Sequence, residues 1–355
     1  MDLEKLRKQI DSLDKEIIER LNARVELAGQ IGQVKRNSGD EIYAPNREEE
    51  VFQKLVEASE GPLDEKAIRA IYRQVMSAST ALQKKLVVAY LGPEATYTQQ
   101  AAQNNFGSSA QYQALRTISD VFASVERSEA DYGVVPIENS TEGAVFHSFD
   151  MLVETDLKIV AQVYLEISLC LISQSPLEKI KSVHSKDNAL GQCRQWLGRK
   201  LPGVPLVDCE STALAVQHAN ENPEIGAIAA RNAAELYKVP IVSENIHDKT
   251  DNITRFLAVG KKSSGRLGKG RDKTSYVFSL RDEAGALVRV LEAFSSRSIN
   301  LCKIESRPNR RKLWDYYFFI DVIGHCDDEP VRESIAELEK NCPFVKWLGS
   351  YPNTE

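Results

Sequence analysis

Two basic residues in the N-terminal part of the chain are spaced so that both could bind one small anion. Lys35 follows Arg24 by eleven residues, so on a helix they point about 20° apart and lie about 16 Å apart along the axis. Two long side chains can converge across that distance. Arg7 precedes Arg24 by seventeen residues, about 26 Å away and about 100° round the helix. Arg7 could therefore reach such a pocket only in a second copy of the chain.

Further polar residues follow in the same part of the chain. Arg47 and Glu48 open a second amphipathic stretch, and Ser79 and Gln83 are four residues apart, on one helical face. Arginines bind carboxylates in bidentate geometry, whereas lysine and amide donors stabilise developing negative charge. The set could thus hold a dicarboxylate without any nucleophile. Each basic residue alone fits a solvated helix charge well, but the whole set at these spacings favours a site.

Four polar loops in the middle of the chain could bind an anion by other means. They span residues 92–102, 136–143, 184–193 and 247–256. The first three stand between an apolar run and a helical pattern, where hydroxyls, amides and backbone N–H groups attract anions. Asn139 and Ser185 lie in these turns, although both could also be simple helix caps. Thr254 lies in the fourth loop, where an ordinary strand threonine is the plain alternative.

The polar residues of the N-terminal part of the chain must be positioned by helices. Within residues 1–85, apolar residues recur mostly at three- and four-residue steps, which predicts a long first helix. Gly39 and Pro45 interrupt this pattern. A second helix is predicted over residues 47–58 and a third from near Asp64. This segment is therefore expected to be all helical.

The rest of the chain shows two other patterns. Residues 86–260 alternate short apolar strands with helices, which predicts an α/β fold with a largely parallel sheet. Residues 273–355 follow the order strand, helix, strand, strand, helix, strand, which is the ferredoxin-like βαββαβ arrangement. Between them, residues 261–273 contain Gly, Ser and Lys in a composition typical of a flexible linker. The chain is thus expected to be multidomain.

Composition excludes several classes of protein. A formal net charge of −6, with no basic cluster outside the linker, argues against nucleic-acid binding. No apolar run approaches the ~20 residues that span a bilayer. The charged, periodic N-terminus differs from a signal or transit peptide, so we expect a cytoplasmic protein.

Metal and nucleotide sites are also not expected. The six cysteines form no CxxC pair and none lies at zinc-ligand spacing from a histidine, which predicts reduced thiols and no metal. Neither GxGxxG nor GxxxxGK[ST] occurs, so no cofactor is expected. His147, His218 and His247 have no matched partners in the sequence and are interpreted as incidental.

The N-terminal segment resembles an all-helical chorismate mutase over its whole length. The matching elements are LRKQIDSLD, LNARVELAGQIGQVK, REEEV and SASTALQ, and Ala44 stands where the family commonly has Asp. The resemblance implies a pericyclic rearrangement of chorismate to prephenate, in which Lys35 and Gln83 donate to the ether oxygen and Glu48 accepts from the substrate hydroxyl. The implied chorismate-binding residues are Arg7 of the partner copy, Arg24, Lys35, Arg47, Glu48, Ser79 and Gln83.

Residues 86–260 resemble prephenate dehydratases. The strongest matches are VVPIENSTEG and NITRF, followed by GPEATYTQQAA, SKDNALGQC and CESTA. Ala95 stands where the family commonly has Gly, and Lys186 where it usually has His. The resemblance implies that Thr254 assists the departing ring hydroxyl, with a water or carboxyl relay through Glu138. The implied substrate-binding residues are Glu138, Asn139, Ser185, Gln192, Glu210, Thr254 and Arg255.

Two further resemblances complete the expected architecture. The α/β segment is similar to periplasmic solute-binding proteins, which implies two lobes around a cleft, with crossings near Val163 and Val239. The segment GALVRVLEAFSSRSINLCKIESRPNR resembles the ACT regulatory domain, which implies a phenylalanine site between paired domains. The implied effector-binding residues are Gly285, Ala286, Leu287, Glu305, Ser306, Arg307 and Pro308.

Together the resemblances imply a bifunctional chorismate mutase–prephenate dehydratase that takes chorismate through prephenate to phenylpyruvate. Phenylalanine is expected to inhibit it through the ACT domain, and the chain is expected to form at least a dimer. Three alternatives stay open: a dehydratase that prefers arogenate, a tetramer, and a purely structural ACT segment. A small-anion sensor built on solute-binding and ACT folds is the rival from another class. A dehydrogenase fusion is excluded because no dinucleotide fingerprint is present.

Overall fold

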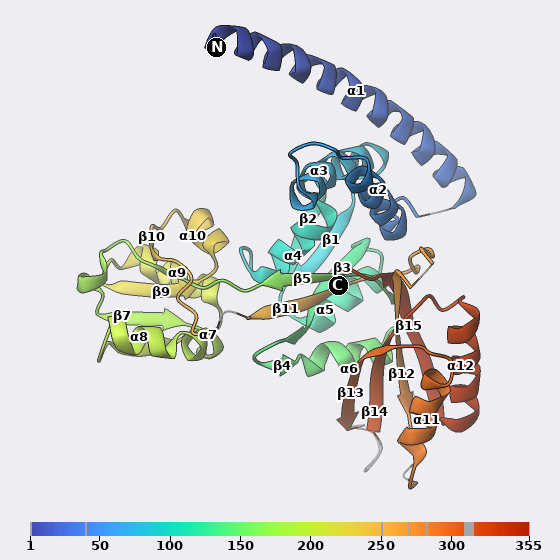
Figure 1. The fold of residues 1–355 in the computed structure, drawn as a ribbon. Coiled ribbons are helices and arrows are strands. Elements are labelled where there is room, and N and C mark those ends of the chain that lie inside the picture. Colours follow the sequence, from blue (N-terminus) through green and yellow to red (C-terminus); the bar gives the residue numbers. More distant parts are fainter. Residues whose placement is uncertain are drawn as a thin grey trace.

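The computed structural model describes residues 2–39, 41–249, 251–268, 270–281, 283–308 and 316–354. Figure 1 shows a group of N-terminal helices at the top, the α/β lobes side by side below it, and a C-terminal sheet with its helices at the lower right. The expected multidomain organisation is therefore confirmed. No helix within the described ranges is long and apolar enough to cross a membrane.

The N-terminal segment is all helical, as expected. Its helices are α1 (Leu3–Ser38), α2 (Pro45–Glu57) and α3 (Glu65–Gln83). Asp64 accepts a hydrogen bond from the Ala67 amide at 2.7 Å and so caps α3. Gly39 ends α1 with a φ of 74°, a left-handed conformation that glycine adopts without strain.

The long first helix lies against α3 and extends well beyond it toward the N-terminus (Figure 1). Its apolar stripe stays largely exposed: Leu3 is 61% exposed, Ile10 56% and Ile31 57%. A contiguous apolar stripe of this kind marks a surface that binds another protein. The amphipathic pattern thus predicts the helix correctly, but this chain alone does not bury its apolar face.

The first α/β lobe is built on a sheet with the strand order β2-β1-β3-β11-β5, and β4 pairs with β3. Its strands are β1 (Val87–Leu91), β2 (Gln111–Leu115), β3 (Tyr132–Asn139), β4 (Gly143–Ala144), β5 (Lys158–Glu166) and β11 (Ile253–Gly260). Its helices are α4 (Tyr97–Phe106), α5 (Ile118–Glu126) and α6 (Phe146–Glu154). The first half of β3, residues 132–135, is buried, as expected for a strand covered by helices on both faces.

The second lobe has a smaller sheet with the order β10-β6-β9-β7-β8. Its strands are β6 (Cys170–Ile172), β7 (Ser182–Ser185), β8 (Leu206–Asp208), β9 (Ile225–Ala229) and β10 (Ile241–Ser243). Its helices are α7 (Asp187–Gln192), α8 (Arg194–Lys200), α9 (Thr212–Glu221) and α10 (Arg231–Tyr237), with a 3-10 turn at Leu177–Lys179. The lobe has its own apolar core, in which Ala215, Val216 and Ala227 are fully buried.

Two details of the α/β segment differ from expectation. The sheets are mixed rather than largely parallel, because β11 runs antiparallel to both β3 and β5, and β6 runs antiparallel to β9 and β10. The lobe crossings also lie later than Val163 and Val239. Val163 is still paired with Phe256 inside the first sheet, and the chain crosses at residues 167–169 and 244–252. The late crossings follow from the length of the β5–β11 pair, in which β5 continues to Glu166 and β11 begins at Ile253.

The C-terminal segment has the expected βαββαβ order, with the sheet order β13-β14-β12-β15. Its elements are β12 (Asp272–Ser279), α11 (Ala286–Ser295), β13 (Leu301–Pro308), β14 (Tyr316–Ile323), α12 (Glu329–Asn341) and β15 (Phe344–Pro352). One sheet face packs on the helices through Phe278 and Phe294. The other shares a core with the first lobe through Val277 and Tyr351. Asn309 and Arg310 of the predicted ESRPNR element, and Trp314 of the predicted following strand, lie outside the described residues.

The connection between the second and third segments is not the free linker that its composition suggests. Lys262 donates to the carbonyl of Gly39 at 2.7 Å, and Arg271 donates to the side chain of Gln53 on α2. Arg266 forms an ion pair with Asp328 in the C-terminal domain. These contacts tie the connection to the N-terminal helical domain and to the C-terminal domain, which composition alone could not reveal.

Candidate active sites

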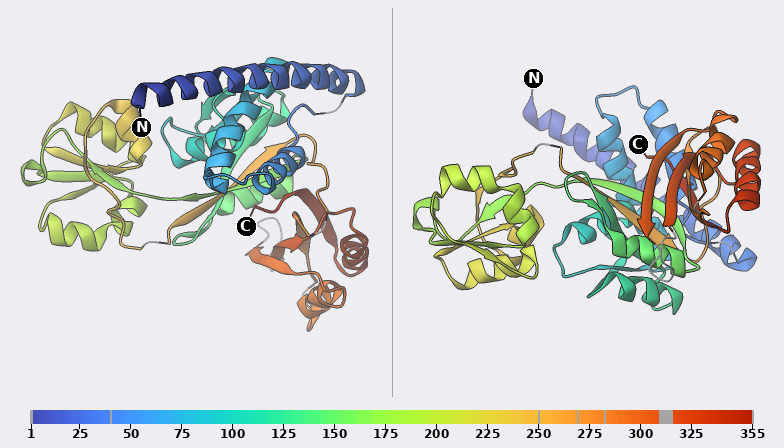
Figure 2. Two further views of the ribbon diagram at one scale, coloured as in Figure 1. Left: turned by 45° about the horizontal axis from the view of Figure 1, so that its top comes forward. Right: turned by 90° about the horizontal axis from the view of Figure 1, so that it is seen from below.

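A cavity of about 1010 Å³ lies between the two α/β lobes. The first lobe contributes the turn after β1, the end of β3 and the start of β11, and the second lobe contributes the N-terminal ends of α7 and α9. Figure 2 shows extended strands that run between the two lobes. Its position at a strand edge, facing helix N-termini, is typical of anion sites in open α/β sheets.

A chain of hydrogen bonds surrounds Thr254 at the floor of the cleft. Thr254 is opposite Asn139 in the β3–β11 register, and the Asn139 amide nitrogen donates to Thr254 Oγ1 at 2.7 Å. The same nitrogen donates to Asn252 Oδ1 at 2.7 Å. Because the Thr254 oxygen accepts here, its own hydrogen is left to point at another acceptor. Thr254 also lines the cavity, so that acceptor can be a bound molecule.

The network continues into the second lobe. Asn252 donates from its amide to Gln192 Oε1 at 2.8 Å, and Gln192 donates to Glu142 Oε1 at 3.2 Å. Gln192 lies on α7, whereas Glu142 lies in the β3–β4 turn of the first lobe. These bonds hold the two walls of the cleft at a defined separation. The structure therefore brings together three of the predicted residues: Asn139, Gln192 and Thr254.

Two cations and two helix N-termini complete the polar lining. Arg116 lines the cavity from the first lobe and Lys186 from the second. The helices α4 and α9 begin at the cleft, capped by Thr96 and Ser211. Positive charge and helix N-termini on opposite walls suit a ligand with two carboxylates. The predicted residue Glu210 also lines the cavity, next to Ser211.

The structure does not bring Ser185, Glu138 or Arg255 into the cleft. Ser185 is fully buried and donates to the carbonyl of Ile228 at 2.6 Å. Side chains alternate along a strand, so Arg255 points away from the face that carries Thr254. Glu138 lies on that other face too, where Lys303 and Arg255 bind its carboxylate.

Arg255 instead connects β11 with the C-terminal domain. It is 4% exposed, and its guanidinium donates to Asp321 at 2.6 Å and to the Tyr351 hydroxyl at 2.9 Å. Burial by itself would lower the pKa of Arg255, but Tyr351 and Asp321 raise it, so the guanidinium stays charged. The neighbouring residue on the strand is Thr254. This ion pair therefore links the floor of the cleft to the sheet of the C-terminal domain.

Sequence reasoning missed several residues of the cleft. Asn252 lies within the NITRF element, and Asn188 and Thr212 lie in the elements SKDNALGQC and CESTA. Their positions within these elements could have identified them as residues of the cleft. Arg116 follows β2 in a stretch that had no signature, so only the tertiary structure places it at the site.

In the helical domain, the contact between α1 and α3 brings three predicted residues together. Arg24 on α1 donates to Ser79 Oγ on α3 at 3.0 Å. Gln83 lies one turn further along α3 and packs against Gly32, where a Cβ would come within 2.6 Å of the Gln83 side chain. The Gln83 side-chain oxygen is buried without a hydrogen-bond partner among the described residues. A buried amide oxygen without a hydrogen-bond partner is costly.

The remaining predicted residues of this domain lie apart from that contact. Lys35 donates to the carbonyls of Glu41 and Ile42, each at 3.0 Å. Glu48 is bound by Arg73 on α3, and burial raises the pKa of Glu48 against the opposing effect of Arg73. Arg47 is exposed and paired with Glu50 at 2.8 Å. Arg7 is exposed on the part of α1 that extends beyond α3.

The predicted effector residues lie at the start of α11 and along β13, an edge strand of its sheet. Gly285 caps α11 with a φ of 79°, and Ser306 and Pro308 are exposed. Arg307 is buried and forms an ion pair with Asp150 on α6 of the first lobe. Ala286, Leu287 and Glu305 are half-buried. The segment thus offers an open edge beside a contact with the dehydratase-like lobe.

Comparisons with known proteins agree with this architecture along the whole chain. Family models match as chorismate mutase type II over residues 6–84, prephenate dehydratase over 88–264 and ACT domain over 275–340. The bifunctional chorismate mutase/prephenate dehydratase of Aquifex aeolicus is 45% identical over 99% of this chain and 98% of its own. This chain belongs to the bifunctional chorismate mutase/prephenate dehydratases. It is an enzyme with both activities.

Other similar proteins support the division into domains. The bifunctional chorismate mutase/prephenate dehydratase of Neisseria gonorrhoeae is 40% identical over 98% of this chain and 96% of its own. A prephenate dehydratase from Arthrobacter aurescens, solved in complex with L-Phe, superposes with a TM-score of 0.71 at 33% identity. That match covers 76% of this chain and 90% of the other. The lobes and the ACT domain together therefore form the part shared with a monofunctional dehydratase.

Proposed function

We propose that the chain makes phenylpyruvate from chorismate at two separate sites and that phenylalanine inhibits the second step through the ACT domain. The assignment of the dehydratase site rests on the hydroxyl of Thr254. Asn139 orients this hydroxyl at the floor of a cavity that has cations on its walls. Arg116 and Lys186 bind the two carboxylates of prephenate from opposite lobes. The ring between them then lies over Thr254.

The proposed chemistry needs a proton at the departing hydroxyl. Loss of carbon dioxide supplies the electron pair that forms the aromatic ring, and the ring C–OH bond breaks as water leaves. The Thr254 hydroxyl donates a hydrogen bond to that leaving oxygen, because its own oxygen already accepts from Asn139. Glu138 is bound by Lys303 and Arg255 on the other face of the sheet. A carboxyl relay would therefore run through Glu142 or Glu210, the acidic residues among the described lining of the cavity.

The proposed mutase site is shared between two chains. One chain supplies the Arg24, Ser79 and Gln83 cluster, and its α1 carries an exposed apolar stripe that a second copy would cover. Arg7 lies on the extended end of α1, so in a pair of antiparallel helices it can reach the cluster of the other chain. Chorismate is then held by arginines from both chains, and Gln83 donates to its ether oxygen. Lys35 joins Gln83 there once it exchanges the carbonyls of Glu41 and Ile42 for the substrate.

The proposed feedback acts through the contact between the ACT sheet and the catalytic strand. Asp321 and Tyr351 of that sheet hold Arg255, the residue after Thr254. A ligand that binds more tightly to one arrangement of the ACT domains increases the population of that arrangement. The contact with Arg255 then changes, and the floor of the cleft changes with it. The L-Phe complex of the Arthrobacter dehydratase supports phenylalanine as that ligand.

The assignment is tested by giving the purified protein chorismate, prephenate or arogenate in separate reactions. We expect loss of chorismate and formation of phenylpyruvate, and formation of phenylpyruvate from prephenate alone. Product formed faster from arogenate than from prephenate would overturn the substrate assignment but leave the dehydratase chemistry in place. Absence of any turnover of chorismate would remove the mutase assignment.

A further inference from the structure

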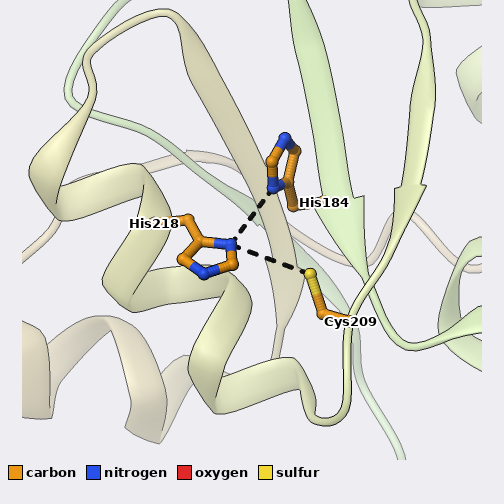
Figure 3. Close-up of side chains that lie close together, drawn as sticks. All are labelled: His184, Cys209 and His218. Atoms are coloured by element: carbon orange, nitrogen blue, oxygen red, sulfur yellow. Dashed lines mark hydrogen bonds between the residues drawn. The ribbon is translucent and has the colours of Figure 1, made fainter.

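Three side chains with metal-binding atoms converge in the second lobe, outside the cleft. They are His184 on β7, Cys209 after β8 and His218 on α9 (Figure 3). His184 Nδ1 lies 3.2 Å from His218 Nδ1, and Cys209 Sγ lies 3.8 Å from the same His218 atom. From the sequence His218 is interpreted as incidental, because it has no matched partner there; His184 lies 34 residues away along the chain. Only the parallel pairing of β7 with β8 and the packing of α9 on the sheet bring the three together.

Two of the three ligand separations match those of a tetrahedral zinc site. Zinc bonds of about 2.0–2.1 Å to histidine nitrogen and about 2.3 Å to cysteine sulfur give ligand separations of about 3.3 Å between nitrogens and about 3.6 Å between nitrogen and sulfur. The observed 3.2 and 3.8 Å are close to these values. All three ligand atoms lie within 4.8 Å of one another. A single ion can therefore contact all three after small side-chain rotations.

A further contact prepares His184 for this role. Its other ring nitrogen, Nε2, lies 3.1 Å from Ser182 Oγ on the same strand. Ligating histidines usually donate their second ring N–H to such an acceptor, which leaves the first nitrogen free of a proton and able to bind the metal. Burial and the neighbouring His218 also lower the pKa of His184, which favours the neutral ring.

We propose that His184 Nδ1, Cys209 Sγ and His218 Nδ1 bind one Zn²⁺ ion, with water in the fourth position. Mixed nitrogen and thiolate ligands at these distances suit zinc better than the oxygen-seeking Mg²⁺ or Ca²⁺. Binding displaces the thiol proton of Cys209 to solvent and leaves the zinc–thiolate bond in its place. No change of oxidation state is involved.

The position of the site gives the ion a structural role next to the cleft. Cys209 is followed directly by Glu210, Ser211 and Thr212, all of which line the cavity. An ion bound to Cys209, β7 and α9 contacts the β8–α9 turn on the side away from the cavity. When the metal site is occupied, this part of the cavity wall therefore moves less. This role does not depend on which dicarboxylate the cleft accepts.

The test compares zinc binding by chelator-treated wild-type protein with three variants. Wild-type protein is expected to bind one Zn²⁺ per chain in competition with a chromophoric chelator. Cys209→Ser and His218→Gln should each weaken binding at least tenfold. Cys326→Ser is the matched control, because His325, Cys326 and Asp327 form a second cluster in the ACT domain. That variant should keep the wild-type affinity.

Cobalt gives an independent readout of the ligand set. Co²⁺ in the wild-type site should show a thiolate charge-transfer band that Cys209→Ser removes and Cys326→Ser retains. Metal-free variants should unfold at the same temperature as metal-free wild-type protein, which separates lost binding from lost folding. Unchanged zinc affinity in both Cys209→Ser and His218→Gln, or a cobalt band that disappears with Cys326→Ser, would overturn the proposal.

Discussion

The dehydratase cleft and the helical mutase domain differ in how much of a site one chain assembles. Within the cleft, Asn139, Thr254, Asn252 and Gln192 form a connected set of hydrogen bonds across both lobes. In the helical domain, Arg24 and Ser79 meet, but Arg47 faces Glu50 and Arg7 lies on an extended helix end. One chain builds both walls of the cleft, whereas α1 leaves its apolar stripe exposed. The proposed mutase site therefore draws on a second chain, whereas the proposed dehydratase site draws on one chain alone.

The largest expected effect is a loss of dehydratase activity with the mutase activity kept. Thr254→Val keeps the shape of the side chain but removes the hydroxyl, so we expect dehydratase kcat to fall about 10²- to 10⁴-fold. Chorismate consumption should continue, and prephenate should accumulate. Thr254→Ser is the matched control and should retain most of the activity. Following both reactions in the same sample checks the result, and a Val variant with near-normal dehydration would exclude Thr254 from the mechanism.

The second effect tests the shared mutase site. Arg7→Ala and Arg24→Ala should each lower mutase activity about 10- to 100-fold, because each removes a charged hydrogen bond to a carboxylate. In a mixed dimer one pocket carries both wild-type arginines, so roughly half of the wild-type activity per heterodimer should return. Isolated heterodimers with two different affinity tags provide the measurement. No recovery in them would rule out a pocket made from two chains, while dehydratase activity should stay unchanged throughout.

A smaller expected effect tests whether Arg255 couples the ACT domain to the cleft. Tyr351→Phe removes one hydrogen bond to Arg255, so phenylalanine should inhibit about five- to tenfold more weakly, as expected for a modest coupling energy. The control is Tyr276→Phe, because Tyr276 is buried on the other side of the same sheet, against the helices. Inhibition curves and calorimetric phenylalanine binding separate lost coupling from lost binding. Equal inhibition of both variants and wild-type protein would argue against the Arg255 route.

The smallest expected effect concerns a residue that the cleft does not include. Ser185 donates to the carbonyl of Ile228 in a buried position, so Ser185→Ala should cost about 1 kcal/mol of unfolding free energy. Its kcat/KM for prephenate should stay within about twofold of wild type, since no contact with the substrate is lost. Denaturant unfolding and steady-state kinetics measure the two quantities. A large rise in KM would show that Ser185 does bind the substrate, as its motif suggests.

Much of the fold follows from local signals that the sequence carries. Three- and four-residue apolar steps predict α1 to α3, Asp64 predicts a helix start, and the alternation of strands and helices predicts an α/β segment. The βαββαβ order of the C-terminal domain follows in the same way. The local signals did not predict the mixed sheet of the first lobe, because the direction of β11 depends on how the β5–β11 pair connects the lobes. Nothing in the local sequence encodes that pairing.

The sequence by itself determined the family, the domain order and the motifs from which the sites are built. Motifs predict which residues are near one another along the chain, but strand alternation decides which face each one occupies. Thr254 and Arg255 are adjacent in sequence, yet one faces the cleft and the other faces Asp321 and Tyr351. His184, Cys209 and His218 carry no recognisable spacing and meet only through sheet pairing and helix packing. Tertiary structure decided these placements, because side-chain direction and long-range contacts depend on the folded sheet rather than on neighbours in sequence.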